Sequence, residues 1–268
     1  MTITVPPEIA KQIRFAAHAI SWTIPMGDAI PGWLDEVVEA GYDGVAVFGF
    51  QIKDFIDRPD DFGRLLDARG LQLAAVTGLL DDTQEWAEKL MDFMSALGAE
   101  HLACTDFDTT LTIPKAIEIL DERAGVGDSR GLKVYYHNHT GGVGETMAQV
   151  EAIFDGIEPA HRHVMLDVGH ATKDFPELPP AERALDFLTR RWGTLEYLEF
   201  KDFNDETDLN TPLGEGYADW DGIAQLIAGG GYEGWIVIEQ NGNLGPSRGR
   251  TPLECATISR DFVRRYGL

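Results

Sequence analysis

Four side chains able to bind a metal ion each follow a short apolar run in the second half of the sequence. These residues are His137, Asp167, Glu199 and Glu239. The runs before them have the length and composition of buried β-strands. The four residues lie 30, 32 and 40 positions apart, and each interval is about one β/α unit. We expect them to end successive strands, which would gather one imidazole and three carboxylates in one place.

A divalent cation would explain how three carboxylates share one site. Carboxylates held close together repel one another by several kcal/mol at a low effective dielectric, unless a cation or protons are present. Oxygen ligands with one imidazole suit Mn²⁺ or Mg²⁺ best, and Co²⁺, Fe²⁺ or Zn²⁺ also accept such ligands. The alternative is that each residue is only a polar strand end exposed in a loop. Glu145 is a reserve ligand if His137 faces elsewhere.

Apolar runs alternate with stretches of helical periodicity along the whole chain. This alternation is typical of β/α units, and eight runs predict an α/β protein with a single (β/α)₈ TIM barrel over residues 1–268. The active site of such a barrel lies at the C-terminal ends of its strands, where the four residues would meet. The expected strands are 14–20, 44–48, 72–77, 101–105, 133–137, 163–167, 196–200 and 235–239. The expected helices are 31–40, 59–69, 83–97, 114–123, 146–156, 180–192, 220–228 and 252–266.

Glycines and polar residues mark the connections between these elements. The connection 201–219 is long and rich in Asp, Asn and Gly, so it is a candidate active-site loop. No strand is followed by the Gly-x-Gly-x-x-Gly loop that binds dinucleotides, and the glycines of 141–144 have the wrong spacing. Four predicted helices end in a glycine that leads almost at once into the next strand, within 40–48, 69–76, 130–136 and 230–238.

The charge of the chain narrows the range of partners. Lys and Arg total 22 against 45 Asp and Glu, which gives a formal net charge of −23. Such a charge repels polyanions, so neither nucleic acid nor an anionic membrane is expected as a partner. The acidic residues are spread along the chain and favour solubility.

The composition also indicates a compartment. No apolar run is long enough to span a membrane, and the first residues lack the features of a signal peptide. Cys104 and Cys255 lie in apolar segments and are expected to be buried free thiols, which fits a reducing compartment. We therefore expect a cytoplasmic protein, and a homo-oligomer is compatible with the sequence.

Five segments of the chain form a recognisable set: Tyr-His-Asn-His at 136–139, Leu-Asp-Val-Gly-His at 166–170, Glu-Phe-Lys-Asp at 199–202, and the segments 212–220 and 231–239. They resemble the xylose-isomerase-like barrels known as sugar phosphate isomerases/epimerases. The likeness covers nearly the whole chain, and its Tyr-His-x-His segment and Gly-Glu-Gly loop are most similar to the inosose dehydratase branch. The resemblance implies a metal-dependent enzyme that acts on a small polyhydroxylated carbonyl compound.

The resemblance also implies roles for individual residues. Asp167 and Glu239 match the family's metal-binding Asp and Glu on strands six and eight. His170 matches a histidine that contacts the substrate, and Lys201 matches the lysine of a His-x-Lys-Asp motif. These matches add substrate-binding and catalytic candidates to the predicted ligands.

The chain departs from the family at two ligand positions. His137 stands where most epimerases have a Glu, and Glu199 replaces the histidine of the His-x-Lys-Asp motif. The family's epimerases use two metal-bound Glu residues as an acid and base pair, so this exchange makes a symmetric epimerase less secure. Glu239 would remove a proton next to a metal-held carbonyl or hydroxyl. His139 or His137 would be the partner acid, and Lys201 would bind the developing oxyanion.

Other residues are expected near the substrate or away from it. His18, near the end of the first strand, and Trp22 are candidate substrate contacts, with packing in the core as the alternative. Phe48, Phe50 and Trp220 are further candidates for apolar walls around a sugar ring. The remaining histidines begin or precede strands and are expected to be structural, at the opposite end of the barrel: His101, His161 and His163.

Several functions remain open at this point. Return of the proton would give isomerisation or epimerisation, whereas loss of a β-substituent would eliminate water from an inosose or the aglycone from a keto-glycoside. Apurinic endonucleases share the fold but use three zinc ions, and four badly placed histidines and the net charge of −23 disfavour them. A catalytically silent barrel that serves as a binding subunit is the third alternative, which the departure at Glu199 keeps open.

Overall fold

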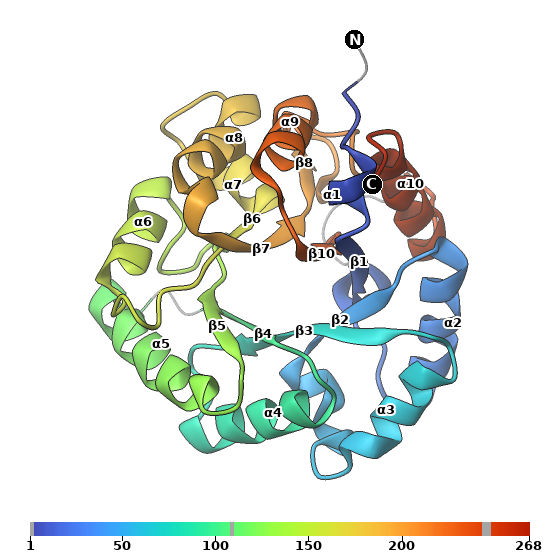
Figure 1. Ribbon diagram of the computed structural model, residues 1–268, viewed down its shortest axis with the longest axis vertical. Coiled ribbons are helices and arrows are strands. Elements are labelled where there is room, and N and C mark those ends of the chain that lie inside the picture. The colour runs from blue at the N-terminus through green and yellow to red at the C-terminus, as the bar shows by residue number, and fades with distance from the viewer. Residues whose placement is uncertain (1–2, 108–109, 243–247) are drawn as a thin grey trace.

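The computed structural model describes residues 3–107, 110–242 and 248–268, and it shows a ring of strands surrounded by helices (Figure 1). Within these ranges, eight strands form one parallel sheet in the order β5-β4-β3-β2-β1-β10-β7-β6. A parallel bridge between Tyr135 and His163 joins β5 to β6 and closes the ring. The predicted (β/α)₈ barrel is therefore confirmed.

Each barrel strand matches its prediction to within two residues at either end. Two further strands form a separate antiparallel hairpin: β8, Asp202–Asn204, and β9, Asp208–Thr211. The barrel strands are β1 Ile13–His18, β2 Gly44–Phe48, β3 Gln72–Leu79, β4 His101–Thr105, β5 Lys133–Tyr136, β6 Val164–Asp167, β7 Leu195–Phe200 and β10 Gly234–Ile238.

The predicted helices pack around the outside of the barrel (Figure 1). They are α2 Ile30–Ala40, α3 Pro59–Asp67, α4 Gln84–Ala96, α5 Ile113–Asp128, α6 Met147–Gly156, α8 Pro180–Arg191, α9 Trp220–Gly230 and α10 Pro252–Arg264. Among the residues that the structure describes, it adds two short helices, α1 Pro7–Ala10 and α7 Val168–Asp174. It also adds four 3₁₀ turns, η1 Ala19–Trp22, η2 Gly27–Ala29, η3 Gly49–Phe55 and η4 Trp192–Thr194.

The predicted active-site loop contains the β8–β9 hairpin and is held by one carboxylate. Asp202 accepts hydrogen bonds from the backbone N–H of Gly216 at 3.1 Å and from the indole Nε1 of Trp220 at 2.8 Å. A Cβ atom at Gly216 would overlap the Asp202 carboxyl group, so glycine is needed for this close approach. Trp220 is buried against Phe200 at 4.9 Å between ring centroids, which places it in the packing rather than along a substrate wall.

Small residues on one half of the barrel interior make room for large ones on the other. Tyr135 and Tyr197 are fully buried inside the barrel, with ring centroids 5.5 Å apart. His101, at the start of β4, stacks on Tyr197 at 4.9 Å and shares a hydrogen bond of 2.9 Å with the Tyr135 hydroxyl. This packing confirms the structural assignment of His101 at the N-terminal end of the barrel. The facing alanines are Ala16, Ala46, Ala74, Ala75 and Ala103.

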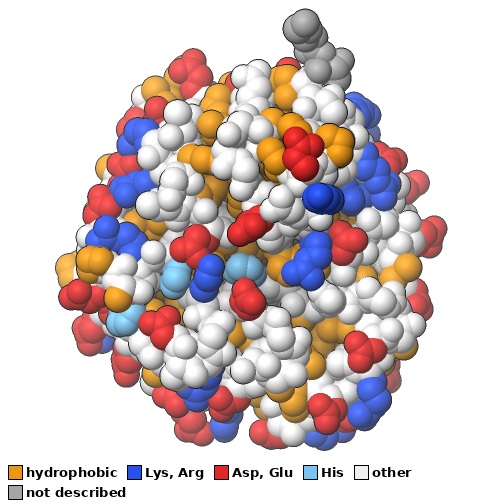
Figure 2. Space-filling model, viewed as in Figure 1, with side chains coloured by type: hydrophobic (Ala, Val, Ile, Leu, Met, Phe, Trp, Pro, Cys, Tyr) orange, Lys and Arg blue, Asp and Glu red, His pale blue; other side chains and the backbone are white. Residues whose placement is uncertain are grey.

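Other features agree with the composition. Cys104 and Cys255 are buried free thiols, as predicted. Acidic and basic side chains are interspersed over the face in Figure 2, which displays no broad basic patch. In the described part of the chain, no helix combines the length and apolar character needed to cross a membrane.

Candidate metal centre

Asp167 is fixed by its own helix and by the neighbouring strand. It ends β6 and caps α7, where its Oδ1 accepts a hydrogen bond of 2.9 Å from the backbone N–H of His170. The Asn138 side chain accepts from the backbone N–H of Asp167 at 2.9 Å and donates to its carbonyl at 3.0 Å. Because β5 ends at Tyr136, this amide replaces the strand pairing that the main chain lacks there. Asn138 is therefore a positioning residue.

The structure brings the four predicted ligands together. His137 Nε2 lies 3.3 Å from Asp167 Oδ2 and 3.2 Å from Glu199 Oε2. One carboxylate oxygen from each of Asp167, Glu199 and Glu239 lies within 4.8 Å of the other two. Atoms bound to one ion at about 2.1 Å are separated by about 3 to 4 Å, so these spacings suit a shared cation. Glu145, the reserve ligand, instead accepts a hydrogen bond from the Gly141 N–H at 3.1 Å. It does not belong to this group of carboxylates.

A buried lysine lies between two of these carboxylates. Lys201 is fully buried, and its Nζ lies 3.0 Å from Asp167 Oδ2 and also pairs with Glu239 Oε1. The stem of Lys201 packs on Gly169, where an added Cβ atom would overlap the lysine side chain. This contact explains the glycine of the Leu-Asp-Val-Gly-His segment. Lys201 is therefore placed to hold these two carboxylates, and its contact with a substrate oxyanion stays a prediction.

The charges of the site call for one more cation. Three carboxylates and one ammonium group leave a net formal charge of −2 when His137 is neutral, and a divalent ion would balance it. Burial raises the pKa of Glu199 to about 7, and the charges of Glu239 and Asp167 add to the rise. Burial also acts to raise the pKa of Asp167, but the Lys201 ammonium, His170 and His137 together outweigh it and hold that pKa well below its usual range. The metal-free site therefore keeps one carboxyl group close to protonation.

Unpartnered atoms at this centre also suit an added ligand. Among the described residues, Glu199 Oε2 and His137 Nδ1 are buried without a hydrogen-bond partner. Buried polar atoms are nearly always satisfied in folded proteins, so such a cluster indicates a binding site. Together with the spacing and the charge, this shows that the residues present fit a divalent cation.

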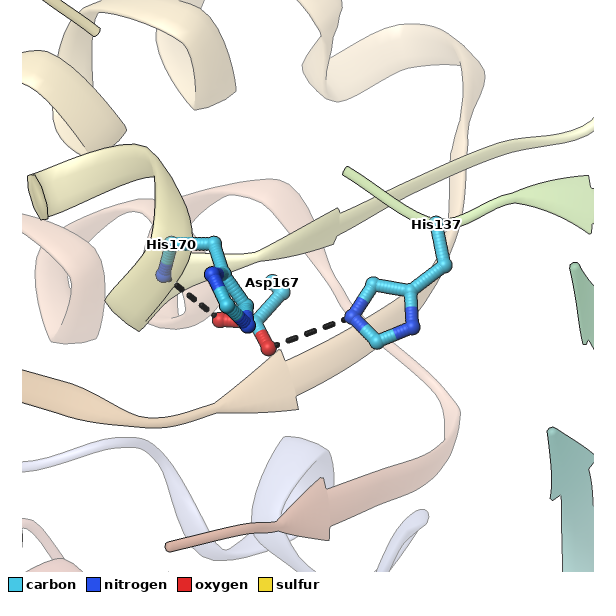
Figure 3. A group of neighbouring side chains, drawn as sticks. All are labelled: His137, Asp167 and His170. Carbon is cyan, nitrogen blue, oxygen red and sulfur yellow. Dashed lines mark hydrogen bonds and ion pairs between the residues drawn. The ribbon is translucent and has the colours of Figure 1, made fainter. Parts of the chain in front are cut away.

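His170 is oriented as a hydrogen-bond donor. In Figure 3, one Asp167 oxygen bonds to the backbone N–H of His170 and the other faces the ring of His137. His170 Nδ1 accepts from the Thr140 backbone N–H at 3.2 Å, and the Thr140 hydroxyl donates to Asp174 at 2.6 Å. With Nδ1 as the acceptor, the neutral ring carries its proton on Nε2, so that atom cannot bind a metal ion. His170 also lies close enough to His137 and Asp167 to form a candidate metal triad, and this tautomer argues against that triad.

A cavity of about 360 Å³ opens beside the charged centre. Glu239 and His137 line it, together with His139, whose Nδ1 lies 2.8 Å from the Thr140 carbonyl oxygen. Because a carbonyl can only accept, Nδ1 carries the proton and Nε2 is a free acceptor. The other lining residues are Ile20, Ile24, Phe48, Phe50, Thr77, Thr105, Phe107 and Asn241.

The two remaining predicted substrate contacts differ in their placement. His18 is buried beside Glu239, with 3.7 Å between His18 Nδ1 and Glu239 Oε2. Both ring nitrogens of His18 already have partners: Nδ1 accepts a hydrogen bond from the Ile20 N–H, and Nε2 lies 3.1 Å from the Thr77 hydroxyl. Trp22 turns away from the cavity and donates to Glu36 on α2 at 2.7 Å. The structure therefore brings His18 to the site and does not bring Trp22.

Two larger hollows lie away from this centre. They measure about 540 and 630 Å³ and are lined by residues such as His101 and Arg14, near the starts of the strands. Neither contains any of the predicted ligands. The smaller cavity is therefore the one associated with the candidate chemistry.

Comparison with known proteins identifies the family. The model of the xylose isomerase-like TIM barrel family matches residues 34–260, and the chain belongs to this family. It is 24% identical to the inosose dehydratase of Bacillus velezensis over 276 aligned residues, which cover 90% of each chain. Identity to the inosose dehydratase of Bacillus licheniformis is also 24%, over 95% of this chain and 96% of the relative.

Solved structures share the same fold. D-psicose 3-epimerase from Clostridium cellulolyticum H10, solved with D-tagatose, superposes with a TM-score of 0.73 and 16% identity, over 94% of this chain and 98% of that chain. The IolI protein, solved with a zinc atom, superposes with a TM-score of 0.70 and 14% identity, over 95% and 98% of the two chains. At these identities the likeness supports the barrel fold.

Proposed function

We propose that this chain is a divalent-metal-dependent enzyme that removes a proton next to a carbonyl group of a small keto-sugar or cyclitol. The observation that carries the proposal is the buried set of three carboxylates, one imidazole and one lysine beside an open cavity. Membership of the family and the inosose dehydratase relatives support an enzyme of isomerase, epimerase or lyase type. Such a costly buried charge cluster also disfavours a catalytically silent barrel.

The metal ion would be held by His137, Asp167, Glu199 and Glu239. When bound, a divalent ion supplies Lewis acidity that stabilises an enediolate, and we expect Mn²⁺ or Mg²⁺ in this role, with Co²⁺, Fe²⁺ or Zn²⁺ as alternatives. The zinc atom in the IolI structure is consistent with a divalent metal in this fold. Lys201 would keep Asp167 and Glu239 ionised and in place.

Glu239 is the residue best placed to accept the proton. Its Oε1 is held by Lys201, and the side chain lines the cavity, so Oε2 is the oxygen available to the substrate. His139 presents an unprotonated Nε2 to the cavity, and burial lowers its pKa to about 4. At neutral pH it is therefore an acceptor rather than the partner acid we expected. The Nε2–H group of His170 is a donor at the charged centre, and it is buried without a hydrogen-bond partner among the described residues.

The His170 donor favours elimination as an alternative to isomerisation after the proton has been removed. Return of the proton to carbon would give isomerisation or epimerisation. A donor that bonds to a β-hydroxyl would instead assist its loss as water, which is the reaction of a dehydratase. The curated relatives named inosose dehydratase support this alternative, and D-psicose 3-epimerase supports the first. Expulsion of an aglycone from a keto-glycoside would use the same intermediate.

Solvent-deuterium exchange tests the proposal. The chain is incubated with Mn²⁺ in D₂O and with ketoses, inososes or 3-keto-glucosides, and NMR follows deuterium at the carbon next to the carbonyl. We expect exchange with wild type and a loss of about 10²- to 10⁴-fold in Glu239→Gln. The exposed Glu85→Gln serves as the matched control and should exchange at the wild-type rate. Unchanged exchange in Glu239→Gln would remove Glu239 as the base, and the product would separate isomerase from lyase.

A further inference from the structure

The mouth of the barrel is divided into a charged half and an apolar half. The candidate ligands lie in the last two residues of β6 and β7 or directly after β5 and β10, and these strands are neighbours around the barrel. The last residue of β2 and the segments that follow β1, β2 and β4 instead bring apolar side chains to the cavity. We call these the apolar wall: Ile20, Ile24, Phe48, Phe50 and Phe107.

Two phenylalanines of the apolar wall are exposed. Phe50 is 41% exposed and Phe107 is 57% exposed. Phe50 stacks on Phe48 with ring centroids 5.0 Å apart, and Phe107 meets the edge of His139 at 4.7 Å. Scattered exposed apolar residues are ordinary, but these two line the same cavity as Glu239. Their exposure is therefore a property of the binding cavity.

Backbone strain also marks this side of the cavity. Thr23 and Ile24 both adopt the left-handed conformation, with φ of 60° and 56°. β-branched residues avoid this region because of steric clashes, and glycine would adopt it without strain. The conformation brings Ile24 to the cavity, and strain of this kind is concentrated at binding and active sites.

Polar and apolar groups of the cavity suit different parts of a ligand. Thr105 Oγ1 and Asn241 Oδ1 line the cavity and, within the described residues, are buried without hydrogen-bond partners, so they can bind hydroxyl groups. The apolar wall offers no hydrogen bonds from its side chains. A sugar hydroxyl that contacts the apolar wall would lose its hydrogen bonds to water and gain none from the wall, which is unfavourable.

We propose that the substrate is a keto-sugar that carries an apolar aglycone, an aryl group in particular, and that the apolar wall binds this aglycone. The inference rests on the proposed function, because it assumes that the sugar ring lies at the charged half. Phe50 and Phe107 contact the aryl ring, while Thr105 and Asn241 contact the sugar hydroxyls. The wall thereby determines the specificity of the enzyme.

Unreactive glycosides test this inference without catalysis. The chain loaded with Mn²⁺ is titrated calorimetrically with phenyl β-D-glucoside, and methyl β-D-glucoside is measured by competition. Burial of a phenyl ring predicts that the phenyl glycoside binds about tenfold tighter or more. In Phe50→Ala/Phe107→Ala the ratio should fall to about twofold, with the Mn²⁺ content unchanged. Val38→Ala, an exposed apolar position on α2, is the control and should keep the wild-type ratio.

The outcomes separate this inference from the proposed function. Equal affinities for the two glycosides in wild type, or an unchanged ratio in the double variant, would overturn the aglycone site even if ketoses exchange deuterium. A tenfold preference that the double variant loses would support the site even if no exchange occurs. In that second case the metal-dependent chemistry would be wrong and the binding site would stand.

Discussion

Lys201 is fully buried, and its ammonium group contacts both Asp167 and Glu239. A charge at this depth is tolerated only when it is paired, and the two carboxylates provide the pairing. The lysine therefore acts as an internal counter-ion that prepares the site before any metal ion enters.

Replacement of Lys201 by Met should destabilise the metal-free chain by about 3 to 5 kcal/mol, because two buried carboxylates lose their counter-charge. Mn²⁺ should restore part of the loss, since it binds the folded state. Urea unfolding in EDTA and in Mn²⁺ measures both effects. Lys89→Met, in an exposed pair with Glu85, should unfold like wild type. Wild-type stability of Lys201→Met in EDTA would contradict this role.

The meeting of the four candidate ligands in one place could be predicted from the sequence, because each lies at or near the end of an apolar run that forms a strand. Relative to the family, His and Glu have exchanged strands in this chain. Because His137 Nε2 and Glu199 Oε2 lie 3.2 Å apart, the site still combines one imidazole with three carboxylates. Asn138 and the Thr140–Asp174 pair could not be predicted, because their roles depend on hydrogen bonds between segments that only the fold brings together.

At the scale of elements, periodicity located the barrel strands and their outer helices but missed the short ones. Helix α7 and the β8–β9 hairpin are too short for a periodic pattern, and Asp167 and Asp202 define them through side-chain hydrogen bonds. Helix α5 extends to Asp128, beyond its predicted end at 123, because Gly125 and Gly127 interrupt the helical signal without ending the helix.

Asp202→Asn should loosen the loop over the charged half of the mouth. Oδ2 of Asp202 accepts from Gly216 and Trp220, and Oδ1 accepts from the backbone N–H groups of Phe203 and Ala218. An amide has only one acceptor oxygen, so the donors on one side would lose their partner, and we expect a loss of about 1 to 3 kcal/mol. Urea unfolding checks this value. Asp205→Asn, at an exposed position of the same loop, should change stability by less than about 0.5 kcal/mol. Equal effects of the two substitutions would show that the carboxylate does not organise the loop.

At the scale of the whole molecule, the two ends of the barrel have different chemistry. The C-terminal end combines the charged centre with the cavity, whereas the N-terminal end contains the packed rings of His101, Tyr135 and Tyr197. Burial lowers the pKa of His101 to about 4, and the Lys133 charge contributes. The stability of the whole barrel should therefore depend on pH through this residue.

The direction of that dependence follows from proton uptake. An unfolded histidine titrates near pH 6.5, so only the unfolded chain binds this proton between pH 6.5 and 4. The contribution is complete above pH 6.5 and falls by about 3 kcal/mol as the pH drops to 4. Urea unfolding at pH 7.5 and 4.5 should show a smaller loss in His101→Gln than in wild type. Equal losses would assign the pH dependence to other groups.

Titration of the metal-free chain with Mn²⁺ tests directly whether the four residues bind a metal ion. We expect about one ion per chain, a loss of affinity of more than about 100-fold in Asp167→Asn, and unchanged stoichiometry in His170→Asn, because His170 is a donor rather than a ligand. Failure of wild type to bind Mn²⁺, Mg²⁺ or Zn²⁺, or wild-type affinity in Asp167→Asn, would contradict the metal centre proposed for this barrel.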